Sequence, residues 1–119
     1  MEFQNRQAIY IQIADYVCEN ILLRKWLDGD KVPSIRDLAV DIQVNPNTVM
    51  RTYNYLQEKG IIENQRGVGY HVAREARQKT VGLKKELFIK EELPVVFKTM
   101  DLLGISFQEI EEIYRENRK

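Results

Sequence analysis

The sequence predicts a mainly α-helical protein with one small β-hairpin, organised as an N-terminal winged helix-turn-helix and a C-terminal arm of two helices. Three observations support this fold class. Two short helical patterns are separated by only Gln43-Val44, a hairpin pattern follows over residues 61–72, and apolar helical patterns return after a polar stretch. Two helices joined by a tight turn and followed by a hairpin form a winged helix-turn-helix. We therefore expect this domain over residues 1–75 and the helical arm over residues 76–119.

The composition fits a small domain with its own core. Hydrophobic residues make up 44% of the 119 residues, which excludes a disordered composition. No apolar run approaches the ~20 residues that a membrane-spanning helix needs, so no membrane partner is expected. Residues 1–6 lack a basic stretch followed by an apolar one, and the single Cys18 cannot form an internal disulfide. These features predict a cytoplasmic protein.

The charge balance is neutral and does not by itself indicate a nucleic-acid partner. Lys plus Arg and Asp plus Glu both total 18, so the formal charge is zero. Residues 45–74 carry four basic and two acidic residues, and hence an excess of two positive charges. Because phosphate neutralisation supplies much of the affinity of DNA-binding domains, the acidic residues are expected to lie away from a DNA-binding face.

The first two helices follow from periodicity and capping. Apolar residues recur every fourth position (Ile9, Ile13, Val17 and Ile21), which predicts a helix over residues 8–25 with one buried stripe. Val32-Pro33 favours an extended approach, and Ser34 is a good N-cap with Asp37 three residues later. A second helix is therefore expected over residues 35–42.

The third helix and the hairpin follow at once. Asn45 is a favourable N-cap and Pro46 suits the first helical position, so a helix is expected over residues 47–59, ending at Gly60. Residues 61–64 and 70–72 read as two short strands around a glycine-bearing turn. Tyr53 is expected in the core.

The last 40 residues carry more apolar side chains than two helices can hide. Pro94 is expected to end or kink one helix, Gly104 to stop it, and Ser106 with Glu109 to cap the last one. A contiguous apolar surface marks an interface, and a two-fold partner is the simplest cover. The predicted dimerisation residues are Leu83, Leu87, Phe88, Val95, Leu102, Leu103, Phe107, Ile110, Ile113 and Tyr114.

Four ordered blocks resemble the GntR family of bacterial transcription regulators, and within it the short YtrA-like branch. They lie at residues 32–39, 44–49, 56–62 and 66–70, and the likeness extends over residues 10–72, with the remainder similar to that branch's two-helix tail. The resemblance implies that Arg36 and the start of the helix opened by Asn45 touch DNA, while the glycine-containing wing tip enters the minor groove. Because the recognition helix begins Asn-Pro-Asn rather than with a basic residue, the target sequence of other branches does not carry over.

Physical reasoning on the residues agrees with this resemblance. A recognition helix inserts its N-terminal residues into the major groove, where Asn can bond to adenine and a Thr methyl can touch thymine. Arg36 can reach a phosphate or a guanine edge. The complete set of predicted DNA-binding residues is Ser34, Arg36, Asn45, Asn47, Thr48, Arg51, Thr52, Arg66, Gly67 and Gly69.

Other functions have weaker support in the sequence. Gly67-Val68-Gly69 lacks the Lys-Ser/Thr of a phosphate-binding loop, and His71 has no cysteine partner for a metal. No nucleophile–base pair is visible, so no enzyme, cofactor or metal is expected. A winged helix used only for protein interaction remains the alternative. The short arm leaves little room for a ligand pocket of ~300 Å³, and the effector is unknown.

These observations predict a sequence-specific regulator, expected to be a repressor, that binds double-stranded DNA as a homodimer on an inverted repeat.

Overall fold

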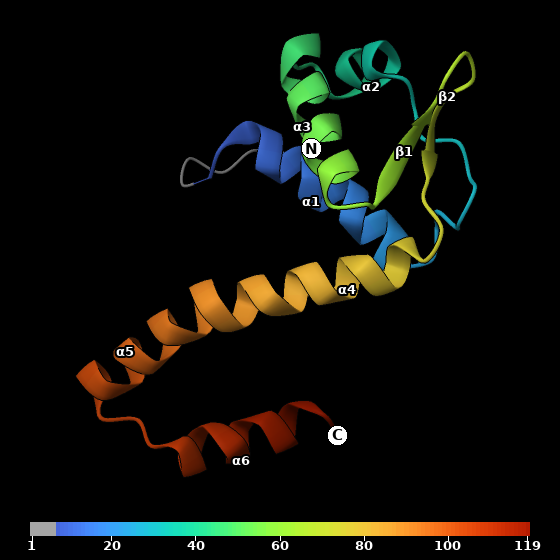
Figure 1. Ribbon diagram of the computed structural model, residues 1–119. Coiled ribbons are helices and arrows are strands. Elements are labelled where there is room, and N and C mark those ends of the chain that lie inside the picture. The colour runs from blue at the N-terminus through green and yellow to red at the C-terminus, as the bar shows by residue number, and fades with distance from the viewer. Residues whose placement is uncertain (1–6) are drawn as a thin grey trace. The chain divides into compact units, whose positions relative to one another are not determined.

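The computed structural model describes residues 7–119, and it has the predicted winged helix-turn-helix order followed by helices (Figure 1). The elements are α1 (Ile9–Leu22), α2 (Ile35–Ile42), α3 (Pro46–Glu58), β1 (Ile62–Gln65), β2 (Gly69–Val72), α4 (Ala76–Leu87), the π-helix η1 (Phe88–Glu92), α5 (Leu93–Leu103) and α6 (Phe107–Asn117). Contacts divide the chain into two compact units, up to Gly82 and from Leu83 to Lys119. The division after residue 75 remains a prediction; Ala76 and Thr80 are buried within the first unit.

The core of the first unit lies around α3, against which α1, α2 and β1 pack. The predicted stripe of α1 supplies Ile13, Val17 and Ile21 to this core, whereas Ile9 at its start is exposed. α1 ends at Leu22, three residues before the predicted end, and Arg24 takes a left-handed conformation with φ 61°. Cys18 is buried, as expected for a small core side chain.

Local capping defines the two helices of the helix-turn-helix. The Ser34 hydroxyl accepts a hydrogen bond from the Asp37 amide at 3.0 Å, and α2 has the predicted bounds. Gln43 ends α2 with φ 56°, and two residues later the Asn45 side chain accepts from the Asn47 amide at 2.8 Å. These caps satisfy amide groups that have no partner inside a helix, which fixes the short connection between α2 and α3.

The hairpin forms the wing. β1 and β2 are antiparallel, with Ile62 opposite Val72 and Gln65 opposite Gly69. Ile62 and Val72 are buried, so the base of the wing is anchored in the core while its turn extends outward. Gly67 in the turn and Gly69 at the start of β2 have φ 79° and 107°, backbone conformations that residues with side chains rarely adopt, which explains why both positions are glycine.

Tyr53 connects three parts of the first unit. Its ring is fully buried on α3 and lies 4.8 Å from the Tyr70 ring of the wing, and its hydroxyl donates to the Pro33 carbonyl at 2.6 Å. Burial, and to a lesser degree the neighbouring Tyr70, raises the pKa of the Tyr53 phenol far above its ordinary value. The expectation of a core tyrosine is confirmed.

The second unit contains helices without a core of their own. Pro94 was expected to end or kink the helix, and the π-helical turn of η1 directly precedes the start of α5, where Pro94 stands. A proline cannot donate the helical bond to the carbonyl four residues earlier, and a wider turn accommodates this loss. Gly104 ends α5 with φ 70°, and the Ser106 side chain accepts from the Glu109 amide at 3.1 Å to begin α6.

The apolar side chains of the second unit remain accessible. None of the residues of η1, α5 and α6 is buried. Of the ten predicted dimerisation residues, Leu83 and Ile110 are half-buried and the other eight are exposed. Three further exposed apolar residues were not predicted: Ile89, Val96 and Phe97.

None of the helices within residues 7–119 combines the length and the apolar character required to cross a bilayer.

Candidate nucleic-acid interface

The start of α3, helix α2 and the turn of the wing lie at the same end of the first unit (Figure 1). This end contains most of the polar residues singled out in the sequence. Asn47 is exposed in the first turn of α3, and Thr48 beside it is half-buried. Asn45 uses its side-chain oxygen to cap α3, so its side-chain NH2 group is the part that can donate to another molecule. An exposed amide at a helix start is suited to base edges and phosphates.

The start of α2 contributes a hydroxyl and a cation. Ser34 accepts from the Asp37 amide, which leaves its hydroxyl hydrogen to donate elsewhere. Arg36 is exposed in the first turn of α2. Its guanidinium has five donors in a planar fork that matches a phosphate or a guanine edge.

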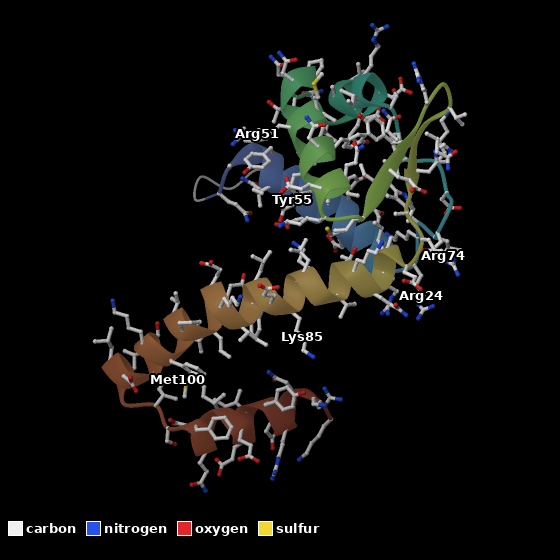
Figure 2. All side chains as sticks on the ribbon, in the orientation of Figure 1. Arg24, Arg51, Tyr55, Arg74, Lys85 and Met100 are labelled. Carbon is white, nitrogen blue, oxygen red and sulfur yellow. The ribbon has the colours of Figure 1, made fainter. Side chains whose placement is uncertain are left out.

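Arg51 occupies a more defined position, one turn further along α3. Its guanidinium carbon lies 3.9 Å from the centre of the Tyr10 ring, which belongs to the first turn of α1. Tyr10 in turn meets the ring of Tyr55 edge-on at 6.3 Å. Figure 2 shows Arg51 and Tyr55 on the side of α3 next to the start of α1. A hollow of about 330 Å³ opens here, lined by Ala8, Ile9, Tyr10, Asn47, Thr48 and Arg51; we call it the Arg51 hollow.

Thr52 does not lie on this surface, and its prediction as a DNA contact is wrong. Its side chain is 0% exposed, and its hydroxyl donates to the Tyr10 carbonyl at 2.7 Å. Successive helical residues are turned by about 100°, so the neighbour of an outward arginine can face inward. Thr52 ties α3 to α1 instead.

The wing tip presents a cation directly before the turn glycine Gly67. Arg66 is exposed beside Gly67, and an added side chain at Gly67 would meet no atom within 4 Å. The turn is closed by the Val68 amide donating to the Gln65 carbonyl at 2.9 Å. Val68 is itself 55% exposed, an apolar tip residue that the sequence analysis did not select. The sequence offered one sign of this exposure, since Val68 stands between Gly67 and Gly69.

The described residues hold no metal-binding group. Within residues 7–119 no three His, Cys, Asp or Glu side chains gather in a way that suits an ion. His71 lies on β2, where a ring nitrogen is 3.1 Å from the Gly69 carbonyl. It has a strand-surface position, as the sequence suggested.

Comparisons with known proteins agree with this geometry. The family model described as "Bacterial regulatory proteins, gntR family" matches residues 9–72, which is the helix-turn-helix with its wing. The chain belongs to the GntR family. It is 38% identical to the HTH-type transcriptional regulator YhcF of Bacillus subtilis, covering 93% of this chain and 90% of that protein. It is 36% identical to the HTH-type transcriptional repressor YtrA of the same organism, over 91% of this chain and 82% of that protein.

A solved structure is similar over nearly the whole chain as well. The crystal structure of a GntR-family regulator from Bacteroides thetaiotaomicron has a TM-score of 0.78 and 47% identity, and covers 92% of this chain and 95% of that one. This GntR regulator is therefore a transcription regulator with a DNA-binding helix-turn-helix, and not an enzyme. The resemblance to the GntR family and its YtrA-like branch is confirmed.

Sequence reasoning missed Tyr10. An aromatic residue in the first turn of α1 has no local pattern that connects it to Arg51, 41 positions later. The contact depends on how α1 packs against α3.

Proposed function

We propose that this GntR regulator is a homodimeric repressor that binds an inverted-repeat operator in the bacterial cytoplasm. The exposed apolar surface of the second unit is the observation that carries this proposal. It implies a second copy, and a two-fold dimer presents two recognition ends related by the same symmetry. Two-fold symmetric proteins of this class bind half-sites separated by about one DNA turn, ~10 base pairs, or a multiple of it.

The helices of the second unit need a partner surface. α6 has 11 residues, below the ~12–15 residues at which an isolated helix becomes even marginally stable in water, whereas α5 continues from η1 without a break. Neither contains a buried residue, although Leu102, Leu103 and Phe107 are each more than 65% exposed. A second copy supplies a matching apolar surface at the same concentration as the first, which makes it the simplest occupant.

Recognition would divide between base edges and phosphates. In the proposal, the start of α3 enters the major groove, with Asn47 and Thr48 at base edges and Asn45 beside them. Ser34, Arg36 and Arg51 contact phosphates or a guanine edge, and Arg66 with Gly67 and Gly69 brings the wing to the minor groove. The neutral charge of the chain supports a dimer, because linking two half-sites raises affinity by ~10²–10⁴-fold without a strongly basic surface.

Repression is supported by the similar protein YtrA, which is named a transcriptional repressor. A repressor needs only to occupy its operator, and a small dimer with a helical arm is sufficient for that.

The dimer is tested with a matched pair of full-length variants. Leu102→Lys and Leu23→Lys each place a lysine near a helix C-terminus at an exposed leucine, but only Leu102 belongs to the proposed interface. A symmetric dimer contains Leu102 twice, and ~1.5 kcal/mol of burial lost per copy raises the dissociation constant about 100-fold. We expect sedimentation to show dimers for the wild type and Leu23→Lys, and monomers for Leu102→Lys.

A wild-type chain that sediments as a monomer at micromolar concentration, or a Leu102→Lys variant as dimeric as the wild type, would contradict the proposed interface.

The operator is tested by selecting bound duplexes from a random-sequence pool. We expect an inverted repeat, and a reporter gene that carries it at its promoter should be less active when the protein is expressed. Selection of no common sequence would favour the alternative, a winged helix that serves protein interaction. Higher reporter activity would make the protein an activator.

A further inference from the structure

The Arg51 hollow lies beside the recognition end of α3 and joins two segments that are distant in sequence. Ala8, Ile9 and Tyr10 come from the start of α1, and Asn47, Thr48 and Arg51 from the first two turns of α3. The Thr52 hydroxyl of α3 donates a hydrogen bond to the Tyr10 carbonyl of α1 at 2.7 Å, which fixes the two helices against each other at this point.

The Arg51 guanidinium is held over an aromatic ring rather than by an acid. It lies 3.9 Å from the Tyr10 ring centre, within the range of a cation–π contact. Among residues 7–119, no Asp or Glu forms an ion pair with Arg51. None of the described residues that line the hollow is acidic, and Asn47 and Thr48 add polar groups to it. This combination attracts an anion, and the side chains of residues 7–119 leave the positive charge of Arg51 uncompensated.

We propose that the Arg51 hollow receives one backbone phosphate of DNA and that Tyr10 is a positioning residue for Arg51. The ring restrains the guanidinium plane before DNA arrives, so less side-chain freedom is lost when the phosphate binds. The planar fork of arginine can then bind the phosphate through two parallel hydrogen bonds. This inference rests on the proposed docking of α3 on DNA and deepens it, since it adds the start of α1 to the interface.

The test uses the full-length protein and a 30-base-pair duplex of random sequence, because a phosphate contact does not depend on sequence. We expect Arg51→Ala to weaken binding and to lower the salt slope by about one for each copy of the site that is engaged. Tyr10→Leu should weaken binding about threefold to tenfold, while Tyr10→Phe retains the ring and binds within twofold of the wild type.

A double-mutant cycle separates positioning from packing. Adding Tyr10→Leu to Arg51→Ala should have no further effect on binding, because the residue to be positioned is already absent. Tyr55→Leu is the matched control: it removes the edge contact to Tyr10 but leaves the ring under Arg51, so binding should stay within twofold of the wild type. Thermal unfolding of every variant gives its stability.

Equal losses from Tyr10→Leu in the wild-type and Arg51→Ala backgrounds would overturn the positioning role, as would a Tyr55→Leu variant that binds as weakly as Tyr10→Leu. If Tyr10→Leu does not fold, Arg51→Lys replaces it in the test. It keeps the charge without the planar fork, so we expect severalfold weaker binding with an unchanged salt slope, and wild-type affinity would refute the proposal. The two proposals can fail separately. If the variants change random-duplex binding as expected but no operator sequence is selected, the proposed operator is contradicted and this phosphate site is still supported.

Discussion

Replacing Tyr53 by phenylalanine removes one hydroxyl from the centre of the first unit and leaves the ring in place. At pH 8 the variant loses the 2.6 Å hydrogen bond to the Pro33 carbonyl. A lost hydrogen bond of this kind lowers the free energy of unfolding by ~1–2 kcal/mol. For a unit of about this size, each kcal/mol corresponds to roughly 4–8 °C in the melting temperature. The variant should therefore be measurably less stable than the wild type at pH 8.

The deficit should disappear at high pH. Burial raises the pKa of the Tyr53 phenol above its ordinary value of 10.0, so the folded protein keeps the proton while the unfolded chain releases it. The stabilisation is complete below pH 10 and is lost as the pH rises above it. At pH 11 the wild type loses ~1.4 kcal/mol through this group, one pH unit above the unfolded pKa. Tyr53→Phe has no such loss, so the two proteins should be about equally stable.

The assay is urea unfolding followed by circular dichroism at pH 8 and pH 11, with every protein at one concentration because association stabilises the folded state. Tyr114→Phe, at a tyrosine of α6 that is 59% exposed, controls for the loss of a phenol in general. A difference between the wild type and Tyr53→Phe that is the same at both pH values would refute the reasoning, because the phenol would then ionise equally in the folded and unfolded states.

Three further predictions concern the interface and the arm. Arg36→Ala should weaken operator binding about 100-fold with an unchanged circular dichroism spectrum, because the proposed dimer contains Arg36 twice and each copy loses a charge-assisted contact of ~1.5 kcal/mol. Full affinity in the folded variant would exclude Arg36 from the interface. Asn47→Ala should reduce the preference for operator over random duplex by ~1–3 kcal/mol, whereas Arg66→Ala should weaken binding to both duplexes and flatten the salt dependence. Wild-type specificity and salt slopes in both variants would show that this division of roles is wrong. Ser106→Ala removes the hydrogen-bond acceptor of the Glu109 amide and should lower the free energy of unfolding in urea by ~1 kcal/mol. An unchanged urea midpoint would mean that α6 does not unfold cooperatively with the rest of the protein.

The elements of the fold could be predicted where their causes are local. Ser34, Asn45 and Ser106 each cap a helix by accepting from an amide two or three residues later, and the sequence shows both partners of each cap. The wing was predictable for a similar reason, since Gly67 in the turn and Gly69 at the start of β2 both have positive φ and lie close together in sequence. Because such interactions join residues that are close in sequence, they can be recognised without knowledge of the tertiary structure.

The candidate site required the tertiary structure wherever distant segments meet. Arg51 and Thr52 are adjacent in sequence, yet one is exposed and the other is buried against the Tyr10 carbonyl. The periodicity of α3 already places Thr52 on the same face as Val49 and Leu56, which lie three and four residues away. Only the packing of α1 on α3 shows that its hydroxyl meets the Tyr10 carbonyl. The same packing brings the Tyr10 ring under Arg51. The amino-acid sequence by itself thus determined the helix-turn-helix, the wing and the family, because these depend on local caps, turns and ordered motifs. The tertiary structure decided which partners the polar side chains of α3 meet in α1, because those contacts join residues about 40 positions apart.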